Sequence, residues 1–121
     1  MADIETDETA ELIASDKVEG TRVYNAQGEK LGSIYNLMID KTSGQVEYAV
    51  LQFGGVLGLG SDYYPVPWVA LEYDEDQGGY VLEVDKELLE RAPRYAAGAQ
   101  PPFSPDYNRE VDTLYGVEYE R

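Results

Sequence analysis

The stretch from Lys17 to Val84 is a series of short apolar segments separated by turn residues. The segments are rich in Val, Ile, Leu and Tyr, whereas Asn, Asp, Gly and Pro stand between them. Because β-branched and aromatic residues favour extended backbone, this pattern is typical of antiparallel strands joined by hairpins. We therefore predict a mainly β fold with about six strands.

Three of the predicted strands carry further information. Leu31 to Asp40 breaks the strict alternation of apolar residues, so we expect a bulge or bend near Gly32 to Tyr35, as the closure of a small barrel requires. Gln45 to Phe53 is largely apolar on both faces, which predicts a central strand. Tyr63 to Pro67 contains two prolines that cannot donate to a ladder, which predicts an edge strand.

Local signals also predict turns and one short helix. Gly28 and Gly44 stand where two turns need a residue with positive φ. Residues 75–79 read as a hairpin turn. Asp85 is the expected N-cap of a helix over Lys86 to Ala92 that Pro93 ends.

Composition divides the chain into three parts. Residues 1–11 are acidic and poor in apolar side chains, so we expect a disordered acidic leader there. Residues 12–93 form the predicted β domain. Residues 94–121 join a linker rich in Gly, Ala and Pro to a helical tail that begins at Ser104 and ends at Gly116.

The charge and two missing residue types exclude several functions. The chain has 24 acids against 9 bases, a formal net charge of −15, no His and no Cys. It therefore lacks the commonest general base, every thiol nucleophile and the usual transition-metal ligands, and we expect neither an enzyme nor a cofactor. Because the charge repels phosphate, we expect no direct binding of nucleic acid. No membrane span or secretory signal is visible, and we expect a cytoplasmic protein.

A glycine-rich segment, residues 54–62, is too apolar for an ordinary solvated loop. Its side chains Val56, Leu57 and Leu59 are candidates for an exposed contact with a partner chain. The alternative, which we favour, is that they fold over the end of a barrel as part of the core. The spacing fits neither known phosphate-binding glycine motif.

The acids offer two weak candidates for a chemical site. Residues 74–85 resemble a calcium-binding loop faintly, but Gly78 and Asp85 stand where such a loop needs an acid or amide and a Glu. We read residues 74–79 as a solvated hairpin turn instead. Paired carboxylates for acid and base catalysis are also disfavoured, because the acids fall at turns and polar strand positions where water keeps them ionised.

Aromatic side chains are the remaining candidates for a binding surface. Tyr63, Tyr64 and Trp68, next to two prolines, would present an aromatic groove to an extended peptide, and one of the two tyrosines must point outward in a strand. We expect Trp68 to be the principal plug of the core. In the tail helix, Tyr107, Val111, Leu114 and Tyr115 form one apolar stripe that covers either this chain's own barrel or a second subunit, which predicts a homodimer.

Three motifs together carry a family resemblance. They are V-Y-N-x-x-G-E-K-L-G at Val23 to Gly32, I-D-x-x-x-G-x-V-x-Y-A-V-L at Ile39 to Leu51, and F-G-G-x-L-G followed by V-P-W between Phe53 and Trp68. With them, Gly20 to Pro93 resembles the PRC-barrel domain, a small antiparallel β-barrel. The family includes the cytoplasmic part of the photosynthetic reaction-centre H subunit and the C-terminal domain of the ribosome maturation protein RimM.

The resemblance implies a barrel that serves as a protein-binding or assembly module without a catalytic motif. We therefore expect a non-enzymatic interaction module with a protein partner of unknown identity. The two relatives imply alternatives: an accessory factor in RNA or ribosome maturation, or a cytoplasmic partner of a membrane electron-transfer complex. From the sequence, we expect neither the membrane helix of the first relative nor the N-terminal domain of the second.

Overall fold

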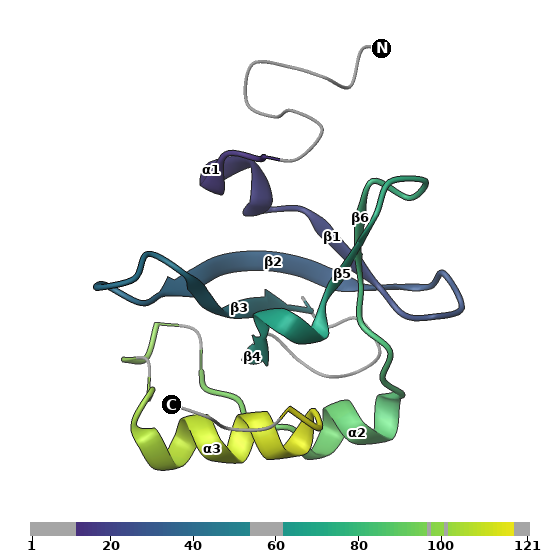
Figure 1. Ribbon diagram of the computed structural model, residues 1–121. Helices are drawn as coiled ribbons and strands as arrows, with labels where there is room; N and C mark the ends of the chain where they lie inside the picture. Colours follow the sequence, from purple (N-terminus) through teal and green to yellow (C-terminus); the bar gives the residue numbers. More distant parts are fainter. Residues whose placement is uncertain (1–11, 54–61, 97, 101, 118–121) are drawn as a thin grey trace.

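The computed structural model describes residues 12–53, 62–96, 98–100 and 102–117 and places six strands in one sheet (Figure 1). The predicted leader, residues 1–11, lies outside these residues. In chain order the elements are α1 (Ser15–Val18), β1 (Arg22–Tyr24), β2 (Lys30–Ile39), β3 (Val46–Gln52), β4 (Tyr63–Pro67), η2 (Trp68–Ala70), β5 (Glu72–Asp74), β6 (Gly79–Val81), α2 (Lys86–Arg91) and α3 (Pro105–Leu114).

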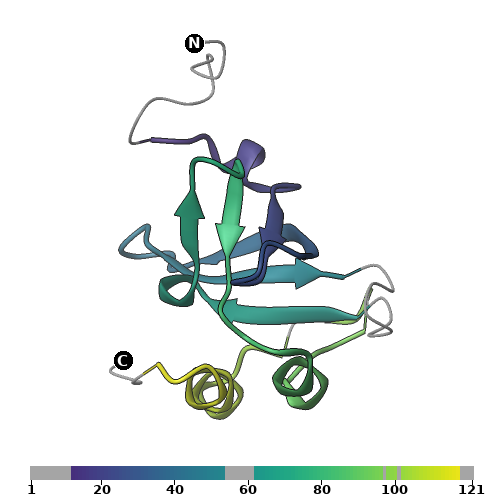
Figure 2. The ribbon, with the colours of Figure 1, turned by 90° about the vertical axis from the view of Figure 1, so that its right-hand side faces the viewer.

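The strand order β4-β3-β2-β1-β6-β5 confirms the predicted mainly β class and the places of β3 and β4. Four pairings are antiparallel, but β1 and β6 run parallel, which the hairpin pattern does not predict. Within the described residues β4 and β5 form no ladder with each other, so the sheet is not closed there. Figure 2 shows β1, β5 and β6 turned steeply away from β3 and β4, so that the sheet curls around its core.

The bend lies in β2, as the sequence predicts. The register between β2 and β3 shifts between Ile34 and Asn36, which places a bulge at Tyr35. Nearby, a Cβ atom on Gly32 would lie 2.5 Å from the carbonyl oxygen of Gln52. Because no side chain fits at that distance, glycine allows β2 and β3 to approach closely where the sheet curves.

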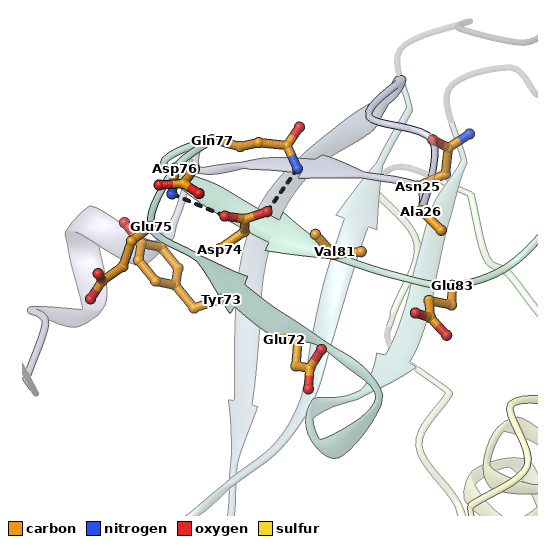
Figure 3. Close-up of a pocket in the computed structure, with 10 residues that line it drawn as sticks. All are labelled: Asn25, Ala26, Glu72, Tyr73, Asp74, Glu75, Asp76, Gln77, Val81 and Glu83. Carbon is orange, nitrogen blue, oxygen red and sulfur yellow. Dashed lines mark hydrogen bonds between the residues drawn. The ribbon is translucent and has the colours of Figure 1, made fainter.

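Side chains close the predicted turns on themselves. The Asp40 carboxylate accepts hydrogen bonds from the backbone N–H groups of Thr42 and Ser43, both at 2.9 Å, and Gly44 takes φ 79°. In the β5–β6 hairpin, the Asp74 carboxylate accepts hydrogen bonds from the N–H of Asp76 at 2.9 Å and from Gln77 Nε2 at 3.1 Å (Figure 3). Because these bonds join residues that are close together in the sequence, the sequence predicts the turns.

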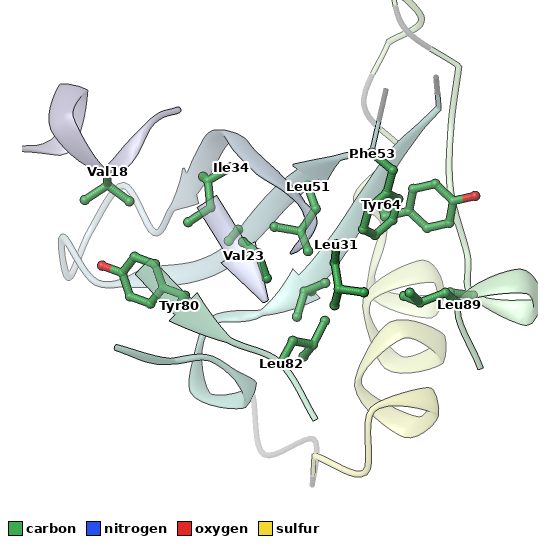
Figure 4. Packing of buried hydrophobic residues seen from close by; sticks show 13 residues of the cluster. Val18, Val23, Leu31, Ile34, Leu51, Phe53, Tyr64, Tyr80, Leu82 and Leu89 are labelled. Carbon is green, nitrogen blue, oxygen red and sulfur yellow. The ribbon is translucent and has the colours of Figure 1, made fainter. Parts of the chain in front are cut away.

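The core lies on the concave side of the curled sheet (Figure 4). Its largest fully buried side chains are Tyr64 and Phe53, whose rings pack edge to face with centroids 4.7 Å apart. The prediction that Trp68 is the principal plug is wrong, because Trp68 is only partly buried and packs against the rim of the core near Tyr80. Trp68 starts η2 where the chain leaves β4, so its ring cannot reach the centre.

Both predicted helices are present with their caps. Asp85 accepts a hydrogen bond from the N–H of Leu88 at 2.8 Å, and Ser104 accepts one from the N–H of Tyr107 at 3.2 Å. In α2, Leu89 is fully buried in the core. Figure 1 shows α2 and α3 in a row below the β4 edge of the sheet, and the turned view of Figure 2 shows that they lie next to each other.

Candidate functional site: an acidic groove and a docked tail

The C-terminal segment is docked on the sheet by a buried hydrogen bond. The Tyr48 hydroxyl in β3 donates to Asp112 Oδ1 in α3 at 3.0 Å, and the two residues are 64 positions apart in the sequence. Asp112 is fully buried and Tyr48 is 3% exposed. A buried carboxylate needs such a donor, so this bond fixes where α3 sits on the sheet.

A chain of aromatic rings continues the docking along the β4 edge. Tyr63 in β4 exchanges two backbone hydrogen bonds with Tyr95, at 2.8 and 3.0 Å, and its ring stacks on that of Tyr35 at 4.3 Å. The ring of Phe103 lies between those of Tyr95, Tyr107 and Tyr48 at centroid distances of 6.2, 5.8 and 5.6 Å. Tyr95 and Phe103 of the linker and Tyr107 of the tail are therefore packed against the sheet of their own chain.

This packing decides where the predicted surface residues lie. Tyr64 and Val111 are fully buried inside this chain rather than open to a partner. Tyr63 and Tyr107 are partly buried, and so are Leu114 and Tyr115, which pack against the core. The predicted loop residues Val56, Leu57 and Leu59 lie outside the described residues. The predicted apolar stripe is present on α3, and in this structure it packs against the sheet of the same chain.

Four buried polar atoms in the described chain have no hydrogen-bond partner, and three of them belong to the tail: Tyr107 OH, Asn108 Oδ1 and Tyr115 OH. The fourth is Asn36 Oδ1. Burial raises the pKa of Tyr107 to about 12, and it raises the pKa of Tyr115 further. The tail interface is thus well packed but incompletely satisfied in its polar groups.

An open groove lies on the side of the β5–β6 hairpin. It consists of two adjoining cavities of about 470 and 610 Å³, which share Asn25, Ala26 and Glu83. Figure 3 shows the residues that line the first of them. Five carboxylates line the first cavity and three line the second, with Glu83 common to both. We call this the acidic groove; its carboxylates are Glu29, Glu72, Asp74, Glu75, Asp76, Glu83 and Asp85.

Local hydrogen bonds make the two turns at the groove rigid. Asn25 is 9% exposed, and its Oδ1 accepts from the N–H groups of Gln27 and Glu29 at 3.0 and 2.9 Å. Its Nδ2 donates to the Glu29 carboxylate at 2.8 Å. On the other side, the hydrogen bonds from Gln77 and from the backbone of Asp76 hold the pKa of Asp74 below its ordinary value. The charged form of Asp74 is therefore favoured, on a turn that its own hydrogen bonds hold in place.

The groove shows no sign of a metal site. Among the described residues, no group of three or more acidic, His or Cys side chains is arranged to hold an ion. Asp74, the first residue of the faint calcium pattern, uses both carboxylate oxygens inside its own turn. Neither cavity has Lys or Arg among its lining residues. Its chemistry therefore suits a diffuse positive charge rather than a single coordinated ion.

Sequence reasoning missed the groove because its acids come from three separated segments, residues 25–31, 72–77 and 81–85. Each acid by itself is an ordinary turn or strand residue. The β5–β6 hairpin brings residues 72–77 and 81–85 together, but only the parallel pairing of β1 with β6 adds residues 25–31. No local pattern in the sequence indicates that pairing.

None of the helices in the described parts of the chain is long and apolar enough to cross a membrane.

The comparisons with known proteins agree with the fold. The family model of the PRC-barrel domain matches residues 10–89, more than half of the chain. A search of curated proteins found no match. The matched region includes all six strands and most of α2, which are the elements that carry the core and the acidic groove. The chain therefore belongs to the PRC-barrel domain family.

Proposed function

We propose that this PRC-barrel domain is a non-enzymatic protein-interaction module that binds a basic protein partner through the acidic groove. The observation that carries the proposal is the concentration of carboxylates in two adjoining cavities that no basic side chain lines. Six of the seven groove carboxylates belong to exposed residues, so they are accessible to the positive charges of a partner.

The non-enzymatic part of the proposal rests on the residue types in the chain. With no His and no Cys, general-base and nucleophilic catalysis would fall to carboxylates, hydroxyl groups and Lys, which need a base or a shifted pKa to become reactive. A catalytic acid needs a raised pKa, whereas the pKa of Asp74, the least exposed groove acid, is lowered by its hydrogen bonds. We accordingly propose no cofactor and no substrate.

The partner is expected to present Lys and Arg on a convex or extended surface. A net charge of −15 speeds the encounter with such a protein and slows the encounter with nucleic acid, so direct RNA contact is the less favoured role. A cytoplasmic location and a homodimer remain predictions. No particular contact in the described structure favours either alternative role, in RNA or ribosome maturation or beside a membrane electron-transfer complex.

The test measures binding of a fluorescein-labelled peptide of alternating Lys and Ala by anisotropy, with backbone NMR shifts to locate it. We expect shifts at residues 25–29 and 72–77, and about tenfold weaker binding for the double variant Glu72→Lys/Asp76→Lys. The control, Glu87→Lys/Glu90→Lys on α2, makes the same change of charge away from the groove. Equal loss in both variants, with shifts spread over the whole surface, would show that only net charge attracts the peptide.

A further inference from the structure

We propose that the segment 103–117 exchanges between two copies of this chain, so that α3 of one copy lies on the sheet of the other. We call this segment the strap. The inference concerns the face covered by α3, and it does not depend on the acidic groove or its partner. Three observations carry it: the polar atoms left unsatisfied under the strap, the residues that its release would expose, and the form of its connection to β4.

The strap covers a polar interface that is imperfectly matched within one chain. Tyr107 OH, Asn108 Oδ1 and Tyr115 OH are buried without a partner in the described structure. Asn36 Oδ1 is the fourth such atom, and Asn36 pairs with Val50, which shares its face of the sheet with Tyr48. Buried groups without partners regain hydrogen bonds to water when the strap leaves, so they lower the free-energy cost of its release.

Release of the strap cannot leave the face of the sheet beneath it exposed to water. Tyr48 is 3% exposed and Val50 is fully buried, and on the strap Val111 and Asp112 are fully buried as well. An occupant must offer a carboxylate to the Tyr48 hydroxyl, with an apolar side chain next to it. The strap of a second copy has these groups at the right spacing and restores every contact that the first copy loses.

The connection of the strap permits exchange while its base stays in place. Arg94 forms an ion pair with Asp62 at 3.4 Å, and Tyr95 forms the two-bond bridge with Tyr63, so the chain is anchored to its own β4 up to Tyr95. Among the described residues between Tyr95 and Phe103, none lies in a strand or helix, and residues 98–100 are exposed. When extended, residues 96–103 reach at most about 28 Å, which is enough to carry α3 to a neighbouring copy.

The experiment uses the full chain and changes only the length of this connection. Deleting residues 98–100 removes the turn closed by the hydrogen bond from the Ala99 N–H to the Ala96 carbonyl oxygen, and so disfavours the return of α3 to its own sheet more than its passage to a partner, whereas inserting Gly-Ser-Gly after Gly98 favours the intramolecular arrangement. Sedimentation equilibrium from about 5 to about 500 µM should show a monomer–dimer equilibrium for the wild type. The shortened variant should dimerise with a Kd at least about tenfold lower, and the lengthened variant with a higher Kd.

A measurement on the wild type guards against a shortened variant that fails to fold. Hydrogen exchange of the α3 amides, Asn108 to Leu114, should slow as protein concentration rises, while exchange of the β3 amides should not. If the Kd of the dimer did not depend on the length of the connection, self-association would involve another surface, and the proposal would be overturned. A monomer at every concentration, with concentration-independent exchange in α3, would overturn it as well.

Discussion

The hydrogen bond between Tyr48 and Asp112 gives the sharpest test of how the tail is held. Tyr48→Phe removes the hydroxyl that donates at 3.0 Å and leaves the buried carboxylate of Asp112 without that donor. A hydrogen bond to a charged acceptor contributes about 1.5–3 kcal/mol, so we expect a loss of that size in the free energy of unfolding. Because a chain of this length has a total stability of roughly 6–18 kcal/mol, the loss is a considerable part of it.

The matched control is Tyr107→Phe. It deletes the same atom at the same interface, but the Tyr107 hydroxyl is buried with no partner. Removing such a group relieves a desolvation penalty, so we expect stability to stay equal or to rise by up to about 1 kcal/mol. The two variants remove the same chemical group, but only Tyr48→Phe should lower the free energy of unfolding.

Urea unfolding followed by far-UV circular dichroism measures both variants, with a common slope against denaturant. In thermal scans, Tyr48→Phe should lower Tm by about 6–12 °C at roughly 4 °C per kcal/mol. A double-mutant cycle with Asp112→Asn should show a coupling of about 1–3 kcal/mol. If Tyr48→Phe stayed within about 0.5 kcal/mol of the wild type, or if both variants lost the same amount, the reasoning would be refuted.

Three further predictions concern the core, the bend in β2 and the alkaline limit of stability. Leu89→Ala should cost about 2–5 kcal/mol in urea unfolding because Leu89 is fully buried, with a smaller loss for the partly buried Leu88→Ala. Gly32→Ala should cost about 1–3 kcal/mol, because its Cβ would lie 2.5 Å from the Gln52 carbonyl oxygen, and a loss no larger than that of exposed Lys30→Ala would contradict this. The pKa of Tyr107 rises from 10.0 to about 12 on folding, so the folded state disfavours its ionisation: stability does not depend on this group below pH 10 and falls as pH rises toward 12. Urea midpoints at several alkaline pH values should fall less steeply for Tyr107→Phe, and parallel slopes would exclude Tyr107 as the cause.

Sequence alone was sufficient for the local parts of this protein. The turn at Asp40 and the caps at Asp85 and Ser104 are made by side chains that bond backbone groups two or three residues away. The prolines of β4 exclude a place inside the sheet by their own chemistry. Such interactions form wherever the same few residues occur, so a short window of sequence predicts them.

Tertiary structure decided which distant segments of the chain lie next to each other. The parallel pairing of β1 with β6 builds the acidic groove from three separated segments, and the bond from Tyr48 to Asp112 spans 64 positions. Trp68 shows the same limit, because its size indicated the centre of the core but its place at the end of β4 keeps it at the rim. These outcomes depend on how the bent sheet packs against the rest of the chain. The energy of a contact between residues far apart in the sequence depends on both partners, so the sequence around either one does not predict it.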